Sequence, residues 1–338
     1  MITDHVNLLC CPGCKANLEL EVPADNGSGD VVREDGHVMT GQLTCTGCAT
    51  VYPVLKGVPR FIPPDNYAAS FGFQWNLHNR TQYDSHSGSP VSRERLFLQT
   101  RWPEQMPGEL VLEAGSGSGR FTEQLVTTDA TVVSLDYSNA VEANYANNGH
   151  NRNLLVIQAN MFELPFPADS FDRVLCIGVL QHTPDPQGAL ASLCTVLKPA
   201  GMLAVDIYRW TWRSAIWPKY YIRPFTRKIP NERLYWMCDK YINLMWPLSS
   251  LISRLGKPGI WINRYLMVPD YRSLYDLKNN AYKTWAKLDL FDMLSPDFDR
   301  PVSIPTFRRW FESLDLDQVD VGPGYNGIEG RAIKSPSG

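Results

Sequence analysis

The sequence predicts an α/β fold: a mostly parallel sheet of seven strands, preceded by a small cysteine-rich module and interrupted near its end by a helical insertion. Three observations support this prediction. Two CxxC pairs lie within the first 62 residues, strand-like and helix-like segments alternate between residues 110 and 208, and a basic, aromatic stretch at 209–300 breaks the alternation. With 338 residues, the chain is long enough for more than one domain.

The composition is that of a globular protein, with 44% hydrophobic and 20% charged residues and a formal net charge of −3. Asp4 and His5 stand where the apolar run of a signal peptide would begin, so we expect no export. The longest uncharged run of the basic stretch, 241–253, is shorter than the roughly 20 residues that cross a bilayer. We therefore expect a cytoplasmic protein, with peripheral contact at the inner membrane face left open.

The paired cysteines of the first segment indicate a metal site. Cys11 and Cys14 form one CxxC pair, and Cys45 and Cys48 form a second one about thirty residues later. Two such turns can supply the four thiolates of a tetrahedral zinc site, which is more typical of a cytosolic chain than disulfides are. Buried free thiols are the alternative reading. We predict that these four cysteines bind one zinc ion.

The residues around the cysteines carry a resemblance. Leu8–Lys15 and Val51–Pro59 resemble segments of the small zinc-ribbon proteins that activate tRNA, rRNA and release-factor methyltransferases, and of their bacterial relatives. Some of those relatives lack the metal, so the resemblance implies the ribbon fold more strongly than it implies zinc.

The middle of the chain has the pattern of a parallel sheet covered by helices on both faces, because strand-like and helix-like segments alternate regularly. The strand-like segments are 110–114, 131–135, 154–158, 173–177 and 202–208, and the helical ones are 119–127, 139–148 and 187–197.

A glycine-rich turn follows the first of these strands. Gly115, Gly117 and Gly119, with Ser116 between the first two, stand where backbone must approach a ligand closely. Asp136 ends the second strand, where an acid can accept hydrogen bonds from a ribose diol. Both features also fit a dinucleotide-binding protein.

Three later segments decide against a dinucleotide-binding protein. In order along the chain they are 158–172, 174–185 and 197–202. They closely resemble class I S-adenosylmethionine-dependent methyltransferases of the type 11-like group, which includes ubiquinone and sterol methyltransferases. The likeness spans residues 110–208. It implies a Rossmann-like, seven-stranded sheet, completed here by a helix at 302–314 and strands at 319–321 and 330–333.

The resemblance also implies a role for each matching residue. The methionine part of the cofactor would lie against Glu113, Gly115, Ser116, Gly117 and Gly119, the ribose against Asp136, and the adenine against Asn160 and Met161, with Tyr137 and Ile177 in the same site. Asn160 departs from the usual acid at its position, although an amide oxygen can still accept a hydrogen bond from the adenine amino group.

Three residues are catalytic candidates. His182 follows the fourth strand, at the sheet edge where α/β proteins bind ligands, and could act as a general base or orient the cofactor. Asp289 and Asp292 could bind or deprotonate a sugar hydroxyl, or could belong to a capping and hinge segment. The surrounding segment 288–301 resembles one in bacterial methyltransferases encoded with surface-polysaccharide and natural-product pathways.

In the resembling fold, the fifth strand is followed by the helix and strand pair that complete the sheet, so the stretch 209–300 is an insertion. We expect it to form a helical cap over the carboxyl edge of the sheet. Between Arg209 and Lys287, fifteen Lys and Arg stand against four acids, and seven of the ten tryptophans lie there. The helical spacing of six residues predicts that they form the core of the cap: Leu234, Met237, Cys238, Tyr241, Leu244 and Met245. The excess positive charge suits an anionic partner, namely a phosphorylated or lipid-linked glycan, an anionic membrane surface or RNA.

We thus expect four segments: a zinc-ribbon module at 1–62, a cofactor-binding core at 63–208, the cap at 209–300, and a helix with a strand pair at 301–338. The function they favour is O-methylation of a glycan, a lipid-linked sugar or a natural product with S-adenosylmethionine. An RNA methyltransferase is the first alternative, although no Asn-Pro-Pro-Tyr run follows the fourth strand. A non-catalytic scaffold or activator is the second.

Overall fold

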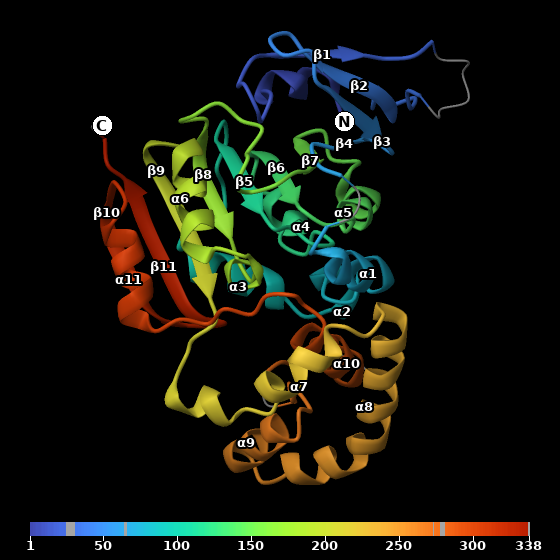
Figure 1. Cartoon of the computed structure of the whole chain (residues 1–338), viewed down its shortest axis with the longest axis vertical. Helices are drawn as coiled ribbons and strands as arrows, with labels where there is room; N and C mark the ends of the chain where they lie inside the picture. Colours follow the sequence, from blue (N-terminus) through green and yellow to red (C-terminus); the bar gives the residue numbers. More distant parts are fainter. Residues whose placement is uncertain (25–30, 64–65, 273, 278–280, 337–338) are drawn as a thin grey trace.

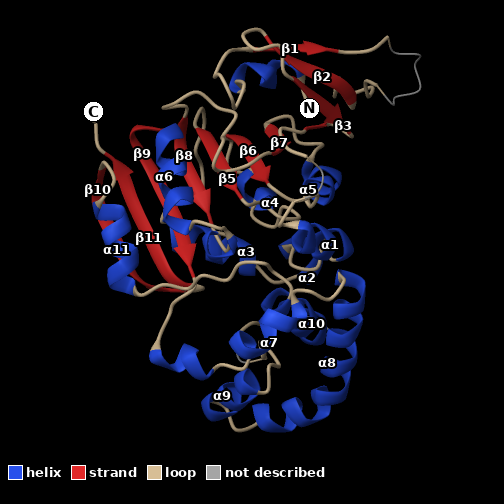
Figure 2. Cartoon of the chain, in the orientation of Figure 1, coloured by secondary structure: helices blue, strands red, loops and turns tan. Residues whose placement is uncertain are grey.

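The computed structural model describes residues 1–24, 31–63, 66–272, 274–277 and 281–336. Three parts follow one another along the long axis of the molecule: the N-terminal module, the large sheet with its helices, and a helical cap (Figures 1 and 2).

The N-terminal module is a small antiparallel sheet of four strands in the order β1-β2-β3-β4. Its elements are η1 (Thr3–Leu8), β1 (Leu18–Glu21), β2 (Thr40–Cys45), β3 (Val51–Leu55) and β4 (Val58–Pro59). Leu43, Val54 and Val58 are buried, but a sheet this short has little apolar core of its own. The predicted ribbon fold is confirmed.

The large sheet has seven strands in the order β10-β11-β9-β8-β5-β6-β7. They are β5 (Leu110–Ala114), β6 (Thr131–Asp136), β7 (Leu154–Gln158), β8 (Phe171–Cys176), β9 (Leu197–Ile207), β10 (Leu316–Gly324) and β11 (Gly327–Lys334). Strands β5 to β9 pair in parallel, whereas β11 pairs antiparallel with β9 and β10. This topology confirms the predicted Rossmann-like, seven-stranded fold class.

Helices cover both faces of this sheet: α1 (Ala69–Leu77), α2 (Asp84–Ser87), α3 (Val91–Thr100), α4 (Thr122–Leu125), α5 (Val141–Asn148), η2 (Leu180–His182), α6 (Pro186–Val196) and α11 (Ile304–Glu312). The sheet has an apolar core on each of its two faces. Leu112 belongs to one core and Val111 to the other, because neighbouring residues of one strand point to opposite faces of the sheet. The helix predicted at 119–127 is shorter than expected, since the backbone of Gly119 has a φ of +95° and cannot continue a right-handed helix.

The cap consists of η3 (Trp212–Ile216), α7 (Lys219–Thr226), α8 (Asn231–Ser253), α9 (Lys257–Tyr265) and α10 (Ala281–Leu294). Leu234, Cys238 and Ile242 of α8 pack against Leu290 and Phe291 of α10. One sequence-based expectation is wrong: Met237, Tyr241 and Leu244 are exposed rather than buried. Among the described helices, none is long and apolar enough to span a bilayer.

The N-terminal module covers the outer edge of the large sheet. Arg60 forms a parallel bridge with Gln158 of the edge strand β7, and the Phe61 N–H donates to the Gln158 carbonyl (2.8 Å). The Arg60 guanidinium also bonds the Gln158 side chain (2.7 Å) and pairs with Glu142 (3.1 Å). The module thus satisfies backbone groups of β7 that an open sheet edge would leave unpaired.

Candidate active site

A cavity of about 590 Å³ lies at the carboxyl ends of the parallel strands, which is where open α/β sheets bind ligands. Gly115 follows β5, Asp136 ends β6, Ile177 follows β8 and Tyr208 follows β9, and all four line the cavity. Helix α1 and the cap close the other sides. Core and cap therefore share one site.

The glycine turn after β5 needs glycine for two separate reasons. Gly115, Gly117 and Gly119 have φ values of +82°, +55° and +95°, which L side chains rarely adopt. A Cβ atom at Gly115 would also lie 2.3 Å from Val179, and one at Gly119 would lie 2.2 Å from the Asn144 side chain. The turn consequently brings bare backbone to the cavity wall.

Asp136 is held rigidly beside this turn. Its Oδ2 accepts from the Gly117 N–H (2.8 Å), and its Oδ1 accepts from both the N–H and the hydroxyl of Ser138 (2.7 Å each). Burial raises the pKa of Asp136 above its ordinary value, while these hydrogen bonds oppose the rise. The carboxylate is thus oriented before any ligand arrives.

Glu113 lies beneath the turn rather than on the cavity wall. Its Oε2 accepts from the hydroxyls of Thr122 (2.5 Å) and Ser134 (2.7 Å), and its Oε1 is buried without a hydrogen-bond partner. Burial raises its pKa to about 7, and the two hydroxyl bonds oppose this shift. One polar atom below the turn is therefore unsatisfied.

His182 is oriented by a backbone carbonyl and two rings. Its Nδ1 lies 3.0 Å from the carbonyl of Phe298, and the imidazole packs against Phe71 and Tyr208 at centroid distances of 5.0 and 5.4 Å. Because Nδ1–H donates to that carbonyl in the neutral ring, the lone pair resides on Nε2. His182 lines the cavity, so Nε2 is placed as a proton acceptor there.

Asp289 and Asp292 lie one turn apart on α10 and both line the cavity. Burial, followed by the neighbouring Asp292 carboxylate, raises the pKa of Asp289 to about 8. Burial also raises the pKa of Asp292, whose Oδ2 accepts weakly from the Tyr208 hydroxyl (3.5 Å). A carboxyl group with a pKa raised in this way can donate a hydrogen bond to a ligand at neutral pH.

Two arginines line the same cavity as Asp289. Arg95 pairs with the buried Asp206 (2.8 Å), whose other oxygen accepts from the Gly178 N–H (2.5 Å). Arg120 donates to the side chains of Gln82 (2.6 Å) and Ser92 (3.2 Å), and among the described residues it forms no ion pair with a carboxylate. Burial lowers the pKa of Arg120 to about 10, which still leaves it charged at pH 7. It is a cation that can receive an anionic or polar group.

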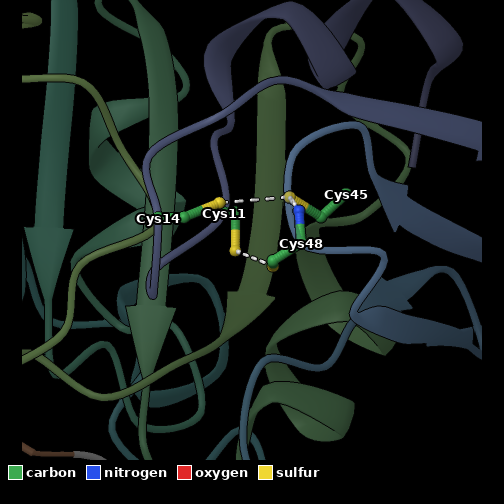
Figure 3. A group of neighbouring side chains, drawn as sticks. All are labelled: Cys11, Cys14, Cys45 and Cys48. Atoms are coloured by element: carbon green, nitrogen blue, oxygen red, sulfur yellow. Dashed lines mark hydrogen bonds between the residues drawn. The ribbon is translucent and has the colours of Figure 1, made fainter.

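The four predicted zinc ligands converge at the other end of the molecule (Figure 3). All four sulfur atoms lie within 4.8 Å of one another, with Cys11 and Cys48 separated by 3.7 Å and Cys14 and Cys45 by 3.4 Å. A tetrahedron with Zn–S bonds of about 2.3 Å has sulfur separations of about 3.8 Å, so the cluster is compatible with a zinc ion. Hydrogen bonds from Thr50 lower the pKa of Cys48 to about 6, which favours the thiolate.

Comparison with known proteins assigns both parts of the chain. Residues 112–205 match the methyltransferase domain family, and residues 4–57 match the Trm112p-like protein family. Residues 112–205 are a methyltransferase domain. The residues that match the Trm112p-like family contain the four-cysteine cluster, whose sulfur geometry is compatible with a zinc site.

Among curated relatives, an uncharacterized chloroplastic methyltransferase of Arabidopsis thaliana is 28% identical over 163 residues, covering 46% of each chain. A ubiquinone/menaquinone biosynthesis C-methyltransferase of Vibrio campbellii is 36% identical over 106 residues, covering 29% of this chain and 41% of that protein. The chain thus spans less than half the length of these relatives. A solved complex of the Haloferax volcanii Trm112 methyltransferase activator with a putative methyltransferase aligns at 13% identity, covering 79% of this chain and 97% of that one, with a TM-score of 0.44.

The methyltransferase domain brings most of the predicted site residues together. Those that line the cavity are Gly115, Ser116, Gly117, Asp136, Tyr137, Met161, Ile177, His182, Asp289 and Asp292. Glu113, Gly119 and Asn160 do not line it, contrary to expectation. Glu113 and Gly119 shape the turn from below, and the Asn160 side chain accepts from the Phe162 N–H (3.1 Å) within its own loop.

Sequence reasoning missed several residues of the cavity wall, among them Tyr67, Trp75, Arg95, Arg120, Tyr275 and Tyr325. Arg120 follows the glycine turn directly, so its position in the sequence could have identified it as a cavity residue. Tyr325 lies in the hairpin between β10 and β11, and no motif marks it.

The raised pKa of Asp289 predicts a pH effect on stability. The folded protein holds this proton more tightly than the unfolded chain, so stability from this group is lost as pH rises from about 4 to about 8. The Asp289→Asn protein lacks that loss. The melting temperature of this variant, relative to that of the parent, should therefore rise by a few degrees as the pH increases from 5 to 8, as measured by calorimetry without ligand. Asp297→Asn, at an exposed residue, is the control, and parallel curves for the parent and Asp289→Asn would contradict the prediction.

Proposed function

We propose that this protein transfers a methyl group from S-adenosylmethionine to a hydroxyl of a polar small molecule: a glycan, a lipid-linked sugar or a natural product. The observation that carries the proposal is the shared cavity. The glycine turn and Asp136 form one part of its wall, and His182, Asp289 and Asp292 form another. A methyl donor and an acceptor bound in the same cavity can be aligned for direct transfer.

The cofactor end of the cavity fits this ligand. The backbone of Gly115 and Gly117 would contact the methionine part, Asp136 would accept from the ribose hydroxyls, and Met161 and Ile177 would pack against the adenine. The carboxyl group of Glu113, with its unsatisfied Oε1, lies under the turn rather than on the cavity wall, and it would favour a cationic amino group on the other side of the turn. When bound, the cofactor supplies a methyl group that its sulfonium already activates.

At the acceptor end, the residues of the chain bind a hydroxyl and remove its proton. His182 Nε2 would accept that proton, and the resulting imidazolium would be stabilised by the nearby Asp292 carboxylate. The protonated Asp289 would donate a hydrogen bond to the acceptor, and Arg120 would bind an anionic or polar substituent. The cap residues that line the cavity would reduce the access of water to the reaction.

The cofactor assignment is tested by titrating S-adenosylmethionine into the parent and an Asp136→Ala protein by calorimetry. The variant loses hydrogen bonds to both ribose hydroxyls and the bond that fixes Gly117, so we expect binding to weaken by about 100-fold. Asp136→Asn keeps the shape but not the charge and should lie between the two. Equal affinity of the parent and Asp136→Ala would refute the assignment.

The acceptor class is tested by incubating the protein with methyl-labelled cofactor and separate pools of glycans, lipid-linked sugars, phenolic natural products and RNA. Label in the glycan, lipid or natural-product pools supports the proposal. Label in RNA alone would favour the alternative in which the basic cap binds RNA. Cofactor binding without transfer to any pool would favour a non-catalytic scaffold.

A further inference from the structure

Helix α8 presents an apolar stripe to solvent. Six residues that follow one another at alternating spacings of four and three are exposed, and Leu244 at their centre is 78% exposed: Met237, Tyr241, Leu244, Leu248, Leu251 and Leu255. This spacing keeps them on one side of the helix, next to the side that buries Leu234, Cys238 and Ile242. The stripe needs a partner, because monomeric proteins rarely leave so many neighbouring apolar side chains in water.

Other elements of the cap also expose aromatic side chains. Trp212 of η3 is 73% exposed and Phe225 of α7 is 74% exposed, and Trp261 of α9 is also exposed. The Arg213 guanidinium lies 5.2 Å from the Trp212 ring and 4.8 Å from the Trp261 ring, so these two indoles lie close together. Tryptophans beside arginines are typical of protein surfaces at the lipid–water interface.

Exposed charge on the same elements is almost entirely positive. Between residues 209 and 272, all of which the structure describes, the exposed basic residues are Arg209, Arg213, Arg227, Lys228, Arg233, Lys240, Arg254, Lys257 and Arg264. Glu232 is the exposed acid in that range. Juxtaposed basic and apolar side chains of this kind match an anionic lipid headgroup layer above acyl chains.

The flanks of the stripe disfavour a second copy of the chain as its partner. Lys240 lies beside the stripe on α8, and Arg254 follows the last residue of the helix, so pairing with an identical helix would bring like charges together. Pro247 also interrupts the interior of α8, whereas a helix–helix seam needs a regular backbone. RNA would complement the positive charge of the cap, but it would not bury the exposed leucines.

We propose that the cap docks on an anionic membrane surface, with the α8 stripe and the tryptophans of η3 and α9 entering the headgroup region. These elements lie at the end of the molecule opposite the N-terminal module (Figures 1 and 2). The cap also supplies Tyr275, Trp285 and Asp289 to the cavity wall, so docking brings the cavity near lipid headgroups. Docking is independent of the proposed methyl transfer.

Vesicle co-sedimentation with full-length protein tests the docking surface. Phosphatidylcholine vesicles with phosphatidylglycerol should bind the parent, more tightly at low salt than at high salt, and vesicles of phosphatidylcholine alone should bind it far less. Leu244→Ser/Leu251→Ser and Arg254→Glu/Lys257→Glu should each weaken binding to the anionic vesicles by about tenfold or more.

Matched controls distinguish binding through this surface from nonspecific hydrophobic or electrostatic binding. Leu55→Ser/Leu98→Ser changes two leucines exposed elsewhere, with Leu98 76% exposed, and Arg152→Glu/Arg309→Glu reverses two charges outside the cap. Both should leave vesicle binding within about twofold of the parent. Calorimetric binding of S-adenosylmethionine should be unchanged in every cap variant, so a failure of docking is distinguishable from a failure of the proposed function.

Three results would overturn the proposal. The first is absence of binding to anionic vesicles at low salt. The second is a parent protein that sediments as a dimer and becomes a monomer on Leu244→Ser/Leu251→Ser, which would make the stripe a self-interface. The third is retention of an RNA oligonucleotide, but not of vesicles, that is lost in Arg254→Glu/Lys257→Glu.

Discussion

Replacing Cys45 and Cys48 with serine is expected to abolish zinc binding and to unfold the N-terminal module. The module has a four-stranded sheet with few buried apolar residues, so the metal must contribute much of its folding free energy. Structural zinc sites in small modules contribute on the order of 10 kcal/mol. Metal analysis should find about one equivalent in the parent and none in the double variant, in line with a closed four-thiolate site.

Cys10→Ser is the matched control, since Cys10 is a buried neighbour whose sulfur does not belong to the cluster. It should retain its zinc and its resistance to limited proteolysis at 1–62, whereas the double variant should be cleaved there rapidly. A double variant without metal that resists proteolysis like the parent would mean that packing alone supports the module.

The same double variant should also destabilise the methyltransferase domain. The module supplies Arg60 to Glu142 and Gln158 and covers the edge of β7. Unfolding the module removes these contacts and leaves an edge strand able to pair with other chains. Light scattering on heating should therefore show earlier aggregation in the double variant than in Cys10→Ser.

His182→Gln is expected to lower kcat for methyl transfer by about 10²–10⁴-fold, the contribution of a general base, with little change in the affinity for S-adenosylmethionine. Glutamine can still donate to the Phe298 carbonyl but offers no basic nitrogen to the cavity. The measurement is steady-state transfer to whichever acceptor the pools identify, together with calorimetric cofactor binding.

His86→Gln, at an exposed histidine outside the cavity, should behave like the parent. If His182→Gln keeps kcat within about threefold but binds the cofactor more weakly, His182 orients the cofactor and the base is another group. Those two outcomes correspond to the two roles that the position of the residue allows.

Local patterns in the sequence were enough to predict helices and strands of the core and to predict two of the site motifs. Strands β5 and β7 begin and end at the residues expected, because a short apolar run bounded by polar and turn residues constrains the backbone locally. The CxxC spacing predicted the sulfur cluster, and the spacing of Gly115 and Gly117 predicted a turn at the cavity wall. In each case the chemistry depends on residues that are close together in the chain.

Only the tertiary structure decided which distant residues meet. Helical periodicity assigned Leu234 and Leu244 to one core, yet α10 covers only the side of α8 that bears Leu234. Periodicity specifies the angle between two side chains on a helix but not which neighbouring element packs there. For the same reason the contact of His182 is invisible in the sequence. The Phe298 carbonyl, in the segment that follows α10, orients His182 of η2, and α10 brings Asp289 to the cavity that Arg120 also lines.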